Sequence, residues 1–202
     1  MQSEKVIALK KRLRNAFRDD FATQWSDALL NRIIVEAQRE YALYSGRLLG
    51  KVELTANGSA VQKLPEDFIQ VVKIIDASGK ILPVVSYRYL AERHGDFRDT
   101  AGTKPLYGCF NFEDFGSFRI YPILPAGTPI GTLIYKRLPS DTVFEVKDMD
   151  AVEQYALYQM YQFTGKKQAS VCYADFESQV NRYDQLSLSS GNITIQRTGN
   201  FF

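Results

Sequence analysis

Residue types that could do chemistry are few in this sequence of 202 residues, and their spacing does not suit catalysis. The sequence contains no GxSxG-type nucleophile elbow whose serine the single histidine, His94, could activate. It also contains no HxxxH, CxxC, calcium-loop, GxGxxG or GKS/GKT motif. His94 lies near the expected end of a short helix, where a positive charge would interact favourably with the last carbonyls. We therefore expect no nucleophilic site, no metal and no cofactor.

Paired carboxylates are the remaining candidates for acid and base catalysis, and each pair lies in an expected turn. The pairs are Glu66 with Asp67, Asp96 with Asp99, and Glu113 with Asp114. Neighbouring acids on a turn do not face each other across a cleft, so we interpret them as solvated turn residues. A small hydrolase that uses Asp96 or Glu66 is the alternative. We expect the chain not to be an enzyme.

A run of basic residues near the N-terminus is the clearest charge feature. Lys10, Lys11, Arg14 and Arg18 follow one another at helical spacing, and turned outward they would attract nucleic acid phosphates. No base-reading motif accompanies them, and a solvated helix face is the simpler interpretation. The formal net charge of +2 is too small to indicate nucleic acid binding by itself.

The composition is that of an ordinary soluble chain with many aromatic residues. Twelve Tyr and 13 Phe accompany one Trp, which suits contact surfaces that are partly wet, or simply a tyrosine-rich core. No run reaches the about 18 apolar residues of a membrane helix, and the start lacks the features of a secretory signal. Cys109 and Cys172 match no metal spacing, so we expect free buried thiols.

Apolar residues at a period near 3.6 predict helices at both ends of the chain. The first covers residues 4–17 and the second begins after a Ser26 cap and ends at Gly46, with Tyr44 in its buried stripe; we expect the two to pair. Near the other end, Asp148 caps a helix with Phe163 on its buried face and Gly165 as its stop, and another helix follows.

Between residues 51 and 137 the period changes to 2 and glycines and prolines mark turns, which predicts strands. Asn57-Gly58 predicts a tight hairpin, and Ser78-Gly79 predicts a second one. A short helix capped by Ser86 precedes three further strands.

These elements predict an α+β chain: a four-helix bundle with an inserted, mostly antiparallel β module and an extended C-terminal tail. The expected domains are residues 1–50 with 148–186, residues 51–147, and the tail 187–202. In that tail, Ile193 and Ile195 alternate as in a strand.

Six segments carry a resemblance to a known family, in the family's order and over nearly the whole chain. They are "LKKRLRNAFRDDFATQWSDALLNRIIVEAQREYA", "LPEDFIQVVKI", "LPVVSYRYLAERHGD", "FRIYPILPAGTPIGTLIYKRLP", "AVEQYALYQMYQF" and "ASVCYADFESQV". The chain resembles the head-to-tail adaptors, or connectors, of tailed bacteriophages, particularly those of short-tailed phages.

The resemblance implies a structural virion protein, assembled in the host cytoplasm, that forms a ring of twelve copies under the portal and extends the DNA channel. Its partners would be the portal protein, tail nozzle or tail-fibre proteins, its own copies, and genomic DNA passing without sequence recognition, with no membrane. The tail would dock on the portal through Ile193, Ile195, Phe201 and Phe202. Lys10, Lys11, Arg14 and Arg18 would line the channel or contact a neighbouring subunit.

Overall fold

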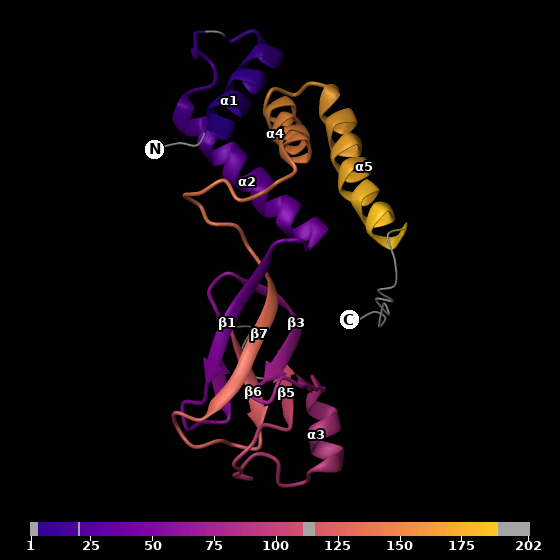
Figure 1. Cartoon of the computed structure of the whole chain (residues 1–202). Coiled ribbons are helices and arrows are strands. Elements are labelled where there is room, and N and C mark those ends of the chain that lie inside the picture. The colour runs from indigo at the N-terminus through magenta and orange to yellow at the C-terminus, as the bar shows by residue number, and fades with distance from the viewer. Residues whose placement is uncertain (1–3, 20, 111–115, 190–202) are drawn as a thin grey trace. The chain divides into compact units, whose positions relative to one another are not determined.

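The computed structural model describes residues 4–19, 21–110 and 116–189, with side chains described through residue 182. The chain is α+β, with helices and antiparallel sheets, as the sequence predicts. It divides into two compact units (Figure 1). The helical unit contains Met1–Ser45 and Pro139–Phe202, and the β unit is Gly46–Leu138.

The helical unit contains four helices whose ends follow the expected capping residues. They are α1 (Glu4–Phe17), α2 (Asp27–Ser45), α4 (Met149–Phe163) and α5 (Gln168–Ser189). The hydroxyl of Ser26 accepts the Leu29 amide at 3.3 Å, and the carboxylate of Asp148 accepts the Ala151 amide at 3.2 Å. Gly46 and Gly165 both have positive φ, +57° and +67°, so the left-handed glycine ends are confirmed.

Helix α4 is the common neighbour in this unit, because it packs against α1, α2 and α5. Helix α1 therefore has α4, and not α2, as its main helix neighbour. One core joins the four helices, and its largest fully buried members are Leu9, Leu13, Trp25, Leu30 and Phe176. Phe163, expected on the buried face of α4, is 81% exposed because it lies in the last turn, beyond the part that other helices cover.

Residues 139–147 belong to the helical unit, although the sequence placed them with the β module. Val146 is buried in the helical core and Phe144 packs against it. The side chain of Gln38 accepts the Glu145 amide at 3.0 Å, and Arg39 forms an ion pair with Asp141 at 2.8 Å. Helix α5 also continues to Ser189, past the expected boundary at residue 186.

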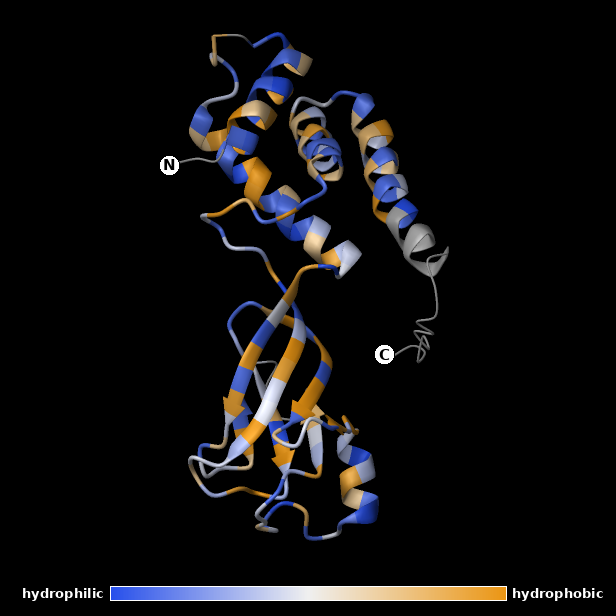
Figure 2. Cartoon of the chain, viewed as in Figure 1, coloured by the Kyte–Doolittle hydropathy of each residue, from blue (hydrophilic) through white to orange (hydrophobic). Residues whose placement is uncertain are grey.

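The described residues of the β unit form two antiparallel sheets and one short helix. The first sheet has the strand order β1 (Leu49–Thr55), β7 (Pro129–Arg137), β3 (Phe68–Asp76) and β4 (Ile81–Leu82). The second has the order β2 (Val61–Lys63), β6 (Ser117–Tyr121) and β5 (Tyr107–Phe110). Helix α3 covers Tyr87–Arg93, and its cap at Ser86 is confirmed. Hydropathy alternates along β1, as Figure 2 shows, because one of its faces lies on the core.

The hairpin expected at Asn57-Gly58 is wrong, whereas the one at Ser78-Gly79 is confirmed by the pairing of β3 with β4. Strand β1 pairs with β7 and strand β2 with β6, so the chain crosses from one sheet to the other after β1. The Gln62 side chain donates to the Asn57 side chain at 2.7 Å and holds this corner. The long pairing with β7 outweighs the local turn preference.

Gly50 lies directly across from Tyr135 in the pairing of β1 with β7. A Cβ atom added at Gly50 would lie less than 3 Å from side-chain atoms of Tyr135. The ring is 5% exposed, and its hydroxyl donates to the Asp67 carboxylate at 2.9 Å. Absence of a side chain at residue 50 therefore allows Tyr135 to reach the turn before β3.

We predict that Gly50→Ala lowers the free energy of unfolding by about 1–3 kcal/mol, because the buried ring must move and its hydrogen bond to Asp67 breaks. Denaturant unfolding of the purified protein measures this. Gly95→Ala is the matched control, since nothing lies within 4 Å of a Cβ built there and its φ is not positive. Equal stability of the two variants would contradict the prediction.

Candidate functional site

The carboxylate pairs are not arranged for acid and base catalysis in the described residues. Asp67 accepts the Tyr135 hydroxyl, and burial together with this hydrogen bond raises the pKa of Tyr135 to about 12. Asp96 and Asp99 are both exposed in one turn, in which the Asp99 amide donates to the Asp96 carbonyl at 3.2 Å. Glu113 and Asp114 lie outside the described residues.

The described residues also contain no arranged site for metal binding or thiol chemistry. Among the described residues, no group of three or more His, Cys, Asp or Glu side chains could hold a metal ion. Cys109 and Cys172 are free and buried, as expected, and burial raises the pKa of each thiol. The His94 ring packs against the rings of Tyr107 and Tyr121.

The four basic residues of the N-terminal run do not form one exposed face. Lys10 is 4% exposed, and its Nζ lies 3.7 Å from the Asp27 carboxylate. The Arg14 guanidinium donates to the same carboxylate at 2.6 Å and to the Trp25 carbonyl at 3.2 Å. The Arg14 hydrogen bond, with the nearby Lys10 charge, lowers the pKa of Asp27. The expectation that Lys10 and Arg14 face outward is wrong, because they fasten α1 to the start of α2.

Two cations of the run do face outward. Lys11 and Arg18 are exposed, and neither forms an ion pair with any described residue. Ile7, one turn before Lys11, is 57% exposed. We call Ile7, Lys11 and Arg18 the basic outer face of α1. Ile7 and Lys11, four residues apart, lie on one side of the helix, and Arg18 directly follows its last residue, Phe17.

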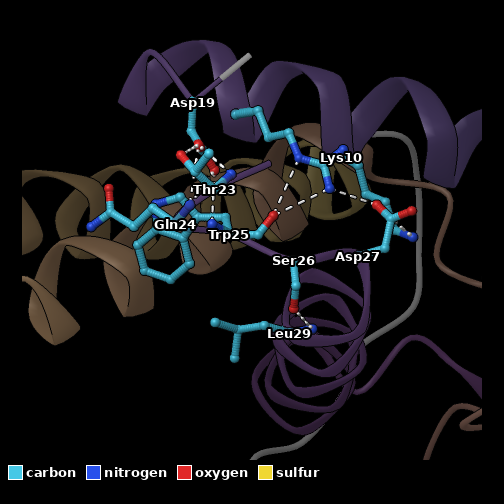
Figure 3. Close-up of polar contacts among 9 residues, drawn as sticks. Lys10, Asp19, Thr23, Gln24, Trp25, Ser26, Asp27 and Leu29 are labelled. Atoms are coloured by element: carbon cyan, nitrogen blue, oxygen red, sulfur yellow. Dashed lines mark hydrogen bonds and ion pairs between the residues drawn. The ribbon is translucent and has the colours of Figure 1, made fainter. Parts of the chain in front are cut away.

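Asp19 organises the loop between α1 and α2. Its carboxylate accepts the amides of Thr23, Gln24 and Trp25 and the Thr23 hydroxyl, at 2.7–3.2 Å (Figure 3). Desolvation alone would raise the pKa of this carboxyl, but the hydrogen bonds, led by the one from Trp25, together lower it to about 2. The loop starts with Arg18 in the left-handed region (φ 54°), where the Asp19 amide donates back to the Arg14 carbonyl.

An aromatic cluster lies at this end of the helical unit, and we call it the aromatic end. It contains Phe17, Trp25, Tyr161 and Phe163, whose neighbouring rings lie 4.6–6.1 Å apart, and the Lys166 ammonium is 4.9 Å from the Phe17 ring. Phe163 is 81% exposed, and Phe21 in the adjacent loop is 90% exposed. Aromatic side chains this exposed are typical of contact sites.

A second surface combines tyrosines with acidic residues, and we call it the acidic tyrosine face. Its members come from three helices: Glu36, Glu40 and Tyr44 of α2, Tyr155 and Tyr158 of α4, and Tyr173 and Glu177 of α5. The hydroxyls of Tyr44 and Tyr173 share a hydrogen bond of 2.5 Å. The rings of Tyr158 and Tyr173 lie 5.0 Å apart.

Burial and hydrogen bonding, with smaller contributions from nearby acids, raise the pKa of two of these tyrosines. Burial, followed by the Glu40 charge and weaker contributions that include Glu36, raises the pKa of Tyr155 to about 12. The hydrogen bond shared with Tyr44, then burial, raises the pKa of Tyr173, to which the Glu177 charge also contributes. No described residue forms an ion pair with Glu36, Glu40 or Glu177.

Sequence reasoning missed this face because it assigned Tyr44 to the buried stripe of α2, whereas Tyr44 is 51% exposed. The spacing of Glu36, Glu40 and Tyr44, one turn apart each time, was the available signal. Similarly, Phe163 was missed as an exposed residue. The expected docking residues Ile193, Ile195, Phe201 and Phe202 lie outside the described residues.

Comparison with known proteins adds one finding. The chain matches the family described as SU10 adaptor protein over residues 5–196, which includes most of the helical unit and all of the β unit. None of the curated proteins matches the chain. Among the described residues, no helix combines the length and apolar character needed to cross a membrane.

We predict that stability provided by the Asp19 carboxylate is lost as the pH falls from about 4 to about 2. The pKa of Asp19 is lower in the folded state than in the unfolded state. Its contribution to stability is therefore complete at a pH above the unfolded-state pKa. The contribution is lost as the pH falls through the folded-state pKa and the carboxylate becomes protonated. Unfolding of wild type and Asp19→Asn at several pH values measures this. The stability difference should shrink towards pH 2, and a difference independent of pH would contradict the prediction. Thr23→Val, which removes one donor, should give an intermediate effect.

Proposed function

The chain belongs to the SU10 adaptor protein family and is thus a phage head-to-tail adaptor, and we propose that copies of it form a ring beneath the portal. The ring contains twelve copies, extends the DNA channel and joins the head to the tail nozzle or fibre-bearing proteins. Genomic DNA passes through it without sequence recognition. Assembly takes place in the host cytoplasm, and the product is part of the virion.

The observation that carries this proposal is the family match itself, since residues 5–196 include both units in their order along the chain. The exposed surfaces of the helical unit support it. A ring of identical copies needs two different contact surfaces on each subunit, because every copy meets one neighbour with each. The aromatic end, the acidic tyrosine face and the basic outer face of α1 supply uncovered surface of this kind.

The helices and the tail have separate roles in the proposal. The four helices act as a bundle that forms the body of the ring, and the C-terminal extension docks on the portal. Ile193 and Ile195 add a strand to a portal edge, while Phe201 and Phe202 fill apolar pockets. The alternation of Ile193 and Ile195 with polar residues supports a strand with one apolar side.

We predict that the purified chain decorates purified portal rings of its own phage, seen by electron microscopy as an added ring of density. Removal of residues 190–202 should weaken docking by roughly tenfold or more, because anchoring residues dominate binding energy. Thermal unfolding of the shortened chain should be nearly unchanged.

A matched pair of tail variants sharpens this experiment. Ile193→Ser with Ile195→Ser removes the apolar side of the expected strand, and Thr194→Ala with Gln196→Ala alters the other side. Only the first pair should reduce docking. A full-length chain that never decorates portal rings would exclude the adaptor ring, and a large loss of melting temperature on truncation would show that the tail belongs to the fold.

A further inference from the structure

Two surfaces of the helical unit carry charged side chains of opposite sign that form no ion pair with a described residue. Most other cations of α1 have acidic partners: Lys10 and Arg14 contact Asp27, and Arg12 contacts Glu153 on α4 at 3.0 Å. Lys11 and Arg18, on the basic outer face of α1, have no such partner among the described residues. Neither do the three acids of the acidic tyrosine face.

Both surfaces also carry exposed apolar area, which charge alone would not require. Ile7 is 57% exposed within the basic outer face of α1. Leu43, which neighbours Tyr44, is 50% exposed beside the acidic tyrosine face. Tyrosine adds apolar area with a polar tip and is enriched in contact surfaces between proteins. Each surface therefore combines exposed apolar area with charged side chains.

The two surfaces lie on different sides of the helical unit. Helix α4 packs against both α1 and α5 and lies between them (Figure 1). The basic outer face points away from the core residues Leu9 and Leu13 of α1. The acidic tyrosine face is formed where α2, α4 and α5 meet. One copy thus cannot satisfy its own charges by folding these two surfaces together.

We propose that the basic outer face of α1 in one copy binds the acidic tyrosine face of a second copy of the chain. This inference rests on the proposed ring, because it names the two surfaces through which neighbours in that ring meet. Such a contact is heterologous: each copy binds one neighbour through its first surface and the other neighbour through its second surface. Repetition of the same contact from copy to copy closes the ring. The outward cations of α1 then contact protein and do not face DNA.

Cysteine cross-linking between two tagged populations tests the contact with this chain alone. One population carries Ile7→Cys and the other Leu43→Cys, and the native Cys109 and Cys172 are buried. The mixture under mild oxidation should form mixed disulfide dimers at least about tenfold faster than either population forms its own dimers, because only unlike cysteines meet in a heterologous contact. Equal rates for like and unlike pairs would overturn the proposal.

Charge reversal provides the second readout. Lys11→Glu with Arg18→Glu in the first population should slow the mixed cross-link by about tenfold, as should Glu36→Lys with Glu40→Lys in the second. The two reversed populations together should regain the original rate. Lys104→Glu, an exposed change of the same charge in the β unit, is the control and should have no effect.

Both reversed populations must show wild-type thermal unfolding, and Lys11→Gln and Glu40→Gln serve as milder substitutes if either fails to fold. A rate that is insensitive to reversal, or that both reversals together fail to restore, would overturn the proposed contact. Portal decoration is measured separately. Loss of cross-linking specificity with intact decoration would reject this contact and leave the adaptor ring standing, whereas specific cross-linking without decoration would reject the adaptor ring.

Discussion

The helical core depends on contact between two parts of the chain that the whole β unit separates. Leu9, Leu13 and Leu30 come from before the insertion, and Val152 and Phe176 come from after it. Helix α4 has apolar contacts on several sides, so neither part can bury its apolar stripe alone. Each surface of the unit takes its residues from helices that this core holds together, and the acidic tyrosine face needs α2, α4 and α5 at once.

Local signals in the sequence predicted the elements well where the cause is local. Ser26, Ser86 and Asp148 cap helices because a side-chain oxygen satisfies an amide within the next three residues. Gly46 and Gly165 end helices because only glycine adopts positive φ without strain. Arg18 adopts the same conformation without being glycine, so no sequence signal marked that helix end.

The predictions that failed depend on neighbours distant in sequence. Asn57-Gly58 favours a hairpin locally, but β7, which lies more than seventy residues further along the chain, takes the place beside β1. Lys10 and Arg14 looked like a surface patch because the sequence does not show that Asp27 lies beside them. Phe163 and Tyr44 follow the buried period, yet Phe163 lies in the last turn of α4, and Tyr44 remains half exposed although it contacts α5.

The pairing of β1 with β7 also bears on how such a chain can vary. Leu49 lies across from Lys136, and the Arg137 amide donates to the Leu48 carbonyl at 2.9 Å, so the first and last strands of the β unit leave it side by side. Because the two ends of the β unit lie side by side, the insertion connects the two parts of the helical unit as a short loop would. The number of residues in the insertion adds little to the entropic cost of closing that loop. The β unit is thus a replaceable module: a different domain with adjoining ends could be grafted between Ser45 and Pro139 while the helical core stayed the same.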